Sequence, residues 1–201
     1  MIHNEYHHLF IAIDIDIKLV ERLTLVQNDL GKIINARGAS VRWTAPENLH
    51  LSLKFLGSHD FALLPELCGY IDDAVRDFPS FSINTAFIGA FPHPDCPRII
   101  YASTDQGLDK LQELRKRVDD VLALYQFVPD KRPYLPHITL GRVKTPLNAL
   151  HFSDAINAIK DLNFGSSHIT EVILYGSNLT SSGAYYTVLS RHPLRRKTKG
   201  A

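Results

Sequence analysis

Two short segments of the chain carry histidine and hydroxyl side chains at the same spacing. Residues 49–57 read Leu-His-Leu-Ser-Leu-Lys-Phe-Leu-Gly, and residues 136–143 read Pro-His-Ile-Thr-Leu-Gly-Arg-Val. In both, apolar residues alternate with polar ones, which is the pattern of a half-buried β-strand. The polar face of the first strand then presents His50 and Ser52. The polar face of the second presents His137 and Thr139, so the repetition predicts two strands that contribute equivalent groups to one site.

A His-x-Ser/Thr triplet is by itself a weak signal, because the chain contains ten histidines and short motifs often match by chance. Two further triplets begin at His151 and His168, and each is followed by an acidic residue. An apolar residue after the hydroxyl is found only in the copies at His50 and His137. A single copy is more often an ordinary surface histidine beside a cross-strand hydroxyl. The matched pair favours a functional site.

Two imidazoles that face one pocket can divide acid and base catalysis between them. The neutral ring accepts a proton from the nucleophile, and the protonated ring donates one to the leaving oxygen. Each transfer contributes roughly 10²–10⁴-fold to the rate. The neighbouring hydroxyls can bond the phosphate oxygens where charge develops. A cyclic phosphodiester suits this chemistry because its strained ring opens with one acid and one base.

No metal site and no cofactor are predicted. The histidines at positions 3, 7 and 8 lie close together, but no cysteine or carboxylate set completes a ligand group. Cys68 and Cys96 are too few for a disulfide framework and lack metal-binding spacing. The proposed acid–base chemistry therefore rests on the two histidines alone.

Composition is that of an ordinary globular protein, with 45% hydrophobic and 21% charged residues in a chain of 201. We expect a single two-lobed domain over residues 1–201. A net charge of +1 argues against a broad nucleic-acid-binding surface. Residues 192–201 are locally basic, which predicts a flexible, solvated tail or, alternatively, a contact with RNA phosphates.

The sequence contains no signal peptide and no membrane span, so we expect a cytoplasmic protein that does not bind membranes. We also expect a monomer.

Hydrophobic periodicity predicts strands and helices in the order β-α-β-α-β-β followed by α-β-α-β-β. This order indicates an α+β fold with two halves, each presenting one motif strand. The expected strands are residues 7–14, 49–57, 81–89, 98–103, 136–143, 167–176 and 183–190. The expected helices are residues 16–37, 61–77, 105–125 and 153–161.

The two motif segments resemble the paired H-x-[S/T] signatures of the two-histidine (2H) phosphoesterase superfamily. They are most similar to its LigT/ThpR branch, the RNA 2′,3′-cyclic phosphodiesterases that are also called 2′-5′ RNA ligases. Ser52 stands where the first signature more commonly has threonine, and it keeps the hydroxyl. The similarity runs almost end to end, through residues 9–14, 43–57, 89–101, 132–142, 171–177 and 183–189.

The resemblance implies a bilobed α+β fold. Its two pseudo-symmetric lobes would each have an antiparallel sheet and outer helices, with the active-site cleft between the sheets. It implies metal-independent hydrolysis of an RNA 2′,3′-cyclic phosphate to a 2′-phosphomonoester, with weak reverse 2′-5′ joining of tRNA-like ends. His50 would be the proton donor and His137 the proton acceptor, although a nearly symmetrical site also permits the reverse. Ser52 and Thr139 would bind the phosphate. The alternatives are a non-catalytic module that binds RNA ends and a phosphodiesterase for small nucleotides such as ADP-ribose cyclic phosphate.

Phe55 and Arg142 each lie five residues after a motif histidine and match substrate-lining positions of the family. Strict alternation puts both on the face opposite the histidines, so a β-bulge or a strand end must turn them. Phe55 is then either a core residue or a base-stacking residue. For Arg142 a phosphate-binding or base-lining role is favoured, because arginine is rarely buried without a partner. Lys54 shares the histidine face by alternation and is expected to be a charge at the rim.

Overall fold

In the residues that it describes, the computed structural model of the chain has nine strands in one antiparallel sheet. It describes residues 7–94, 96–128, 133–145, 149–159, 161–180 and 183–196. The strands are β1 (His7–Asp14), β2 (Val41–Trp43), β3 (His50–His59), β4 (Phe81–Phe91), β5 (Ile99–Gln106), β6 (His137–Val143), β7 (Asn163–Ile169), β8 (Glu171–Thr180) and β9 (Gly183–Pro193). In the described residues their order across the sheet is β7-β4-β5-β6-β3-β1-β8-β9, with β2 paired to β6.

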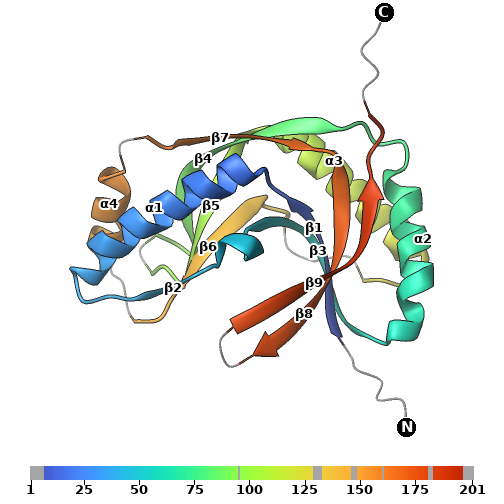
Figure 1. The fold of residues 1–201 in the computed structure, drawn as a ribbon, viewed down its shortest axis with the longest axis horizontal. Coiled ribbons are helices and arrows are strands. Elements are labelled where there is room, and N and C mark those ends of the chain that lie inside the picture. Colours follow the sequence, from blue (N-terminus) through green and yellow to red (C-terminus); the bar gives the residue numbers. More distant parts are fainter. Residues whose placement is uncertain are drawn as a thin grey trace, which may run out of the picture.

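Helices cover one face of this sheet. Figure 1 shows α1 and α4 over one half of the molecule and α2 and α3 over the other, in agreement with the contacts that α1 makes with β7 and α2 with β9. This is the α+β arrangement that the element order predicts. The helices are α1 (Ile17–Asn35), α2 (Leu64–Val75), α3 (Leu108–Leu124) and α4 (Ala149–Asn157), and two 3-10 turns are η1 (Pro46–Asn48) and η2 (Phe61–Leu63).

The C-terminal part of the sheet differs from the prediction. The segment predicted as one strand over 167–176 is divided between β7 and β8, which meet at Thr170. Strand β7 also begins earlier than predicted, at Asn163. Near this start Gly165 has φ +112° and Phe164 is an extra residue opposite β4. A positive φ and a bulge shift the phase of the alternation, so the apolar residues of β7 do not follow a period of two.

The two motif strands place their apolar residues in the core between sheet and helices. Leu51 and Leu53 of β3 and Ile138 and Leu140 of β6 are fully buried there, with the apolar stripes of α1 and α3. Because side chains alternate across a strand, this burial turns the intervening polar residues to the face away from the helices. A slip of one residue would bury the imidazoles and expose the leucines, so the register is strongly fixed.

Alternation predicts Lys54 at the rim, and this prediction is wrong. The side chain is buried, with only 1% of its surface exposed. An irregularity in the pairing of β3 with β1 makes Leu53 an extra residue, so Lys54 turns towards the helices. Its Nζ lies 2.6 Å from Oδ1 of Asp119 and donates to the carbonyl of Val128. Asp119 also accepts from Nε of Arg115 at 2.5 Å, so one carboxylate compensates two buried cations.

The first residues of the predicted basic tail belong to the fold. His192 is 2% exposed, its Nδ1 lies 2.7 Å from Asp72 of α2, and its Nε2 lies 2.7 Å from Ser190. Leu194 is buried, and the backbone of Arg195 forms an isolated parallel β-bridge with that of Pro79. The boundary predicted at residue 192 is therefore wrong, and residues 197–201 lie outside the described residues. No helix in the described part of the chain is long and apolar enough to cross a membrane.

We predict that Asp119→Ala lowers the free energy of unfolding by about 3–5 kcal/mol, because it removes the carboxylate that pairs with the buried ammonium group of Lys54. Urea denaturation measures this change. Asp120→Ala is the matched control on the same helix. Asp120 pairs with Lys116 at the surface, and losing such a pair costs at most about 1 kcal/mol. Equal effects of the two substitutions would contradict the assigned role of Asp119.

Candidate active site

Strands β3 and β6 meet at a single registered pair, Leu51 with Ile138. These are the middle residues of the two His-x-hydroxyl triplets. In an antiparallel pair the flanking residues also face each other, so His50 lies opposite Thr139 and His137 lies opposite Ser52. The structure therefore brings together all four predicted side chains on one partly exposed surface. We call this surface the histidine face; it is the side of the sheet away from the helices.

Each histidine ring is fixed by the same local contact. Nδ1 of His50 is 2.8 Å from the carbonyl oxygen of Asn48, and Nδ1 of His137 is 2.8 Å from that of Leu135. A carbonyl only accepts, so in both rings Nδ1 carries the hydrogen and Nε2 is left for proton exchange. Nε2 of His50 lies 3.0 Å from Oγ of Ser52, within reach of its hydroxyl.

The electrostatics favour the neutral form of both rings. Burial lowers the pKa of His50, which the hydrogen bond to Asn48 and the charge of Asp14 oppose and which the charge of His137 reinforces. Burial likewise lowers the pKa of His137, against its hydrogen bond to Leu135. Because a charge on one imidazole disfavours a charge on the other, the two rings belong to one electrostatic site.

The environment of His50 is aromatic and contains one carboxylate. The His50 ring lies 5.1 Å from the Phe10 ring and 5.3 Å, edge to face, from the Tyr186 ring. Asp14 of β1 is the cross-strand partner of His50. The Tyr175 hydroxyl donates to Asp14 at 2.5 Å. Sequence reasoning missed these neighbours, since β1, β8 and β9 reach the site only through the order of strands in the sheet.

The environment of His137 is also aromatic. The rings of Phe91 and Tyr101 lie 5.0 and 5.5 Å from the His137 ring, both edge to face, and they stack on each other at 4.4 Å. Gly89 permits this arrangement, because a Cβ at that position would overlap with the ring of Tyr101. Sequence reasoning missed Tyr101, although the glycine two residues before Phe91 is a signal of close approach.

Both motif strands contain the bulge that Phe55 and Arg142 require. Leu53 is the extra residue of β3 opposite β1, and Leu140 is the extra residue of β6 opposite β5. Each stands three residues after its histidine, and residues 50–55 and 137–142 share one pattern of burial. The bulges turn the residues at the fifth position onto the histidine face.

Contacts of the two side chains agree with this placement. Phe55 is 67% exposed, and its ring lies 5.8 Å from that of Phe10, so it is not a core residue. Arg142 is exposed, and its charge opposes the rise that burial causes in the pKa of Tyr186. Arg42 of β2 lies directly opposite Arg142 and is also exposed. Sequence reasoning missed Arg42, because β2 has only three residues and shows no periodicity.

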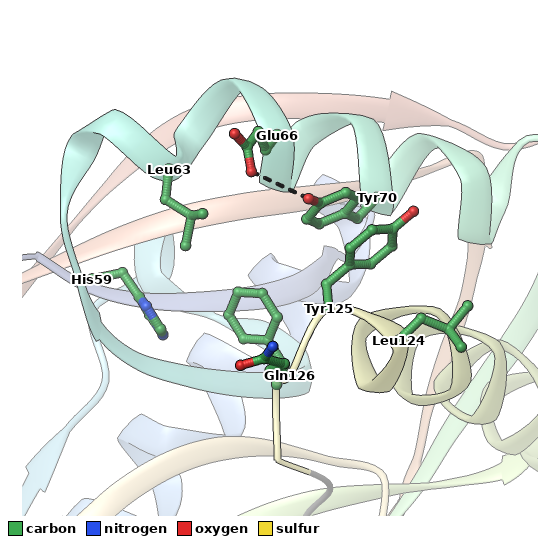
Figure 2. A pocket seen from close by; sticks show the side chains of 8 residues that line it. His59, Leu63, Glu66, Tyr70, Leu124, Tyr125 and Gln126 are labelled. Atoms are coloured by element: carbon green, nitrogen blue, oxygen red, sulfur yellow. Dashed lines mark hydrogen bonds between the residues drawn. The ribbon is translucent and has the colours of Figure 1, made fainter.

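A pocket of about 450 Å³ lies elsewhere, between α2 and the end of α3 (Figure 2). His59, at the opposite end of β3 from His50, lines it together with the stacked rings of Tyr70 and Tyr125. It contains no residue of either motif, so we place the chemistry on the histidine face. Within the described residues, no group of three or more His, Cys, Asp or Glu side chains is arranged to hold a metal ion.

Comparison with known proteins agrees with the geometry. Residues 36–178 match the family model of the 2′-5′ RNA ligase superfamily. The chain is 31% identical over 178 residues to an RNA 2′,3′-cyclic phosphodiesterase of Methanothermobacter thermautotrophicus, covering 89% of this chain and 94% of that protein. It is 32% identical over 181 residues to a protein of the same name from Methanocaldococcus jannaschii, covering 90% and 97%.

Solved structures show the same fold. Escherichia coli LigT in complex with 3′-AMP superimposes with a TM-score of 0.72 at 25% identity, over 94% of this chain and 99% of that one. The protein TT0787 of Thermus thermophilus gives a TM-score of 0.74 at 26% identity, over 95% and 100%. These likenesses confirm the LigT-like α+β fold that the two motifs imply. The chain belongs to the 2′-5′ RNA ligase superfamily.

Proposed function

We propose that this protein hydrolyses the 2′,3′-cyclic phosphate at the end of an RNA strand to a 2′-phosphomonoester, with His50 and His137 as acid and base and without a metal ion. The observation that carries the proposal is the pairing of the two triplets about Leu51 and Ile138, which sets two anchored imidazoles and two hydroxyls on one face. Relatives at about this length that are 31–32% identical bear the name of this activity.

The reaction needs two proton transfers. Nε2 of His137 takes a proton from water, whose oxygen then forms a bond to phosphorus. The bond from phosphorus to O3′ breaks, and the leaving oxygen takes a proton from Nε2 of His50. The products are a 2′-phosphomonoester and a free 3′-hydroxyl, and exchange with solvent restores both rings. If a 5′-hydroxyl replaces water as the nucleophile, the same steps form a bond from its oxygen to phosphorus and break the bond to O3′, which gives the weak 2′-5′ joining.

The carboxylate of Asp14 supports His50 as the acid, although burial has the larger effect and, with the charge of His137, lowers the pKa of this ring. Asp14 lies opposite His50, and its negative charge favours the protonated imidazole. For His137, the effect that opposes the lowering of the pKa by burial is the backbone hydrogen bond to Leu135, with no contribution from a carboxylate in the described residues. Burial keeps both rings neutral in the free enzyme, so the substrate's phosphate supplies the further negative charge that protonates His50.

The remaining groups suit a nucleotide phosphate. Ser52 and Thr139 stand beside the two rings and would donate to the non-bridging oxygens, while Arg142 would pair with the phosphate charge. Phe55, exposed beside Phe10, offers a surface on which a base can stack. A cytoplasmic location and a monomeric state, which the sequence suggests, remain predictions.

A module that only binds RNA ends is the second candidate. Fixing both Nδ1 atoms to carbonyl groups favours catalysis over binding, because it leaves two Nε2 atoms ready for proton exchange on the same face. A phosphodiesterase for small nucleotides would use the same groups, and comparing an oligonucleotide with a mononucleotide substrate separates it from an RNA-end enzyme.

We predict that His50→Ala and His137→Ala each lower kcat by roughly 10²–10⁴-fold, because each removes one proton transfer. The assay uses an RNA oligonucleotide that ends in a 2′,3′-cyclic phosphate, with EDTA present, and ³¹P NMR identifies the product as a 2′- or 3′-phosphate. Binding of the oligonucleotide without turnover by the wild type would favour the binding module. Loss of turnover in EDTA that added metal restores would contradict the metal-free mechanism.

The hydroxyls provide a separate prediction. Ser52→Ala should lower kcat by about 10²-fold, as removal of one donor to a developing charge does elsewhere. Ser52→Thr keeps the hydroxyl and is expected to retain nearly full activity, which makes it the matched control. Similar losses in both variants would show that the serine acts through its size rather than through its hydroxyl.

We also predict that both imidazoles titrate below pH 6.5 in the free protein, because burial lowers the pKa of each. NMR titration of the ring protons measures the midpoints, with the urea-unfolded chain as the reference at about 6.5. The unfolded chain takes up these protons at the higher pH, so stability decreases as pH falls below about 6.5. A bound nucleoside 2′-phosphate should raise the midpoint of His50. Midpoints at or above the unfolded value in the free protein would contradict the assigned burial.

A further inference from the structure

The carbonyl oxygen of each bulge residue accepts a hydrogen bond from a buried polar side chain of the helix behind it. Gln27 of α1 is 3% exposed, and its Nε2 donates to the carbonyl of Leu140 at 2.8 Å and to that of Thr44 at 2.9 Å. Arg115 of α3 is 6% exposed, and its Nη1 donates to the carbonyl of Leu53. The two bulges are thus supported in the same way from the two halves of the molecule.

Both positions are unusual for polar residues. Gln27 lies in the buried stripe of α1 between Val26 and Leu30, and Arg115 lies in that of α3 beside Leu114. Burying a polar or charged side chain there costs free energy unless its hydrogen bonds are made. A bulge also interrupts the strand ladder and leaves a backbone carbonyl that needs a donor. Each bulge carbonyl therefore satisfies a donor of the polar side chain behind it, and the carbonyl of Leu140 accepts from Gln27 in addition to a backbone N–H.

Further contacts hold each donor in place. Asp119 accepts from Nε of Arg115 and from Nζ of Lys54, the residue that follows the bulge, so both sides of the β3 bulge are tied to α3. In β6 the backbone N–H of Thr44 also donates to Leu140, at 2.8 Å. Gln27 thus joins the bulge of β6 to the segment that leads into β3.

We propose that Gln27 and Arg115 are positioning residues for the substrate. They hold the two β-bulges, and the bulges turn Arg142 and Phe55 onto the histidine face. This inference rests on the proposed function, since Arg142 and Phe55 bind substrate only if the histidine face is the active site. Gln27 and Arg115 lie in the helix layer and do not reach the histidine face, but they affect the affinity for substrate through the bulges.

The position of the bulges gives the role a kinetic signature. The histidine and hydroxyl of each motif precede the bulge and are held by the pair of Leu51 with Ile138, whereas Gln27 donates its hydrogen bonds to Leu140 and Thr44. Loss of Gln27 therefore releases Arg142 and leaves the acid–base pair in place. The expected result is a higher KM with little change in kcat.

A double-mutant cycle tests this role. Gln27→Met keeps the side-chain volume and removes the donor. We expect it to raise KM about 3- to 10-fold, which is in the lower part of the range of couplings between linked residues, with kcat within about twofold. In an Arg142→Ala background the same substitution should leave KM unchanged, because the residue it positions is gone. Arg115→Lys, tested against Phe55→Ala, is the second cycle and keeps the charge beside Asp119.

Asn84→Ala is the matched control. Asn84 lies in β4, and its buried amide donates to Asp105 of β5 and to Asn163 of β7. It should lower the melting temperature without changing KM. The proposal would be overturned if Gln27→Met changed KM equally in the wild-type and Arg142→Ala backgrounds. It would also be overturned if Gln27→Met and Arg115→Lys each left KM unchanged. A crystal structure of Gln27→Met gives an activity-independent readout. It should show Arg142 displaced, and an intact bulge with Arg142 in place would overturn the proposal even if the wild type did not turn over the cyclic phosphate.

Discussion

The pairing of Leu51 with Ile138 is the constraint on which the site depends. Both side chains are buried against the helices, so the residues on either side of them must point to the other face. Each motif needs only this alternation to present a histidine and a hydroxyl, and the antiparallel pairing then sets each histidine opposite the other strand's hydroxyl. The energy that fixes the register is hydrophobic burial, and the proposed chemistry uses the face that burial leaves free.

Two further features extend this symmetry, and one breaks it. Both strands bulge three residues after the histidine, and both bulges are supported by a buried polar side chain, Gln27 or Arg115. The carboxylate of Asp14, in contrast, lies beside His50 and has no counterpart among the groups that shift the pKa of His137. A nearly symmetrical scaffold with one additional charge is a physical basis for giving the two imidazoles different roles.

The sequence predicts those parts of the site that depend on local alternation. His50, Ser52, His137 and Thr139 lie together as expected, because each belongs to a strand with a clear period of two. Features that depend on pairing between distant strands were not predictable. Asp14, Tyr101 and Arg42 reach the site through strand order, and Lys54 is buried because a bulge reverses its direction. Strand β7 was predicted only in part, since the positive φ of Gly165 interrupts its pattern.

The central claim, that the two imidazoles share one site, is tested most directly by titrating His50 in the presence and absence of His137. The charge of His137 lowers the pKa of His50 in this structure. NMR titration of the free protein should therefore give a higher midpoint for His50 in His137→Gln than in the wild type. An unchanged midpoint would show that the rings do not sense each other, and would contradict the account.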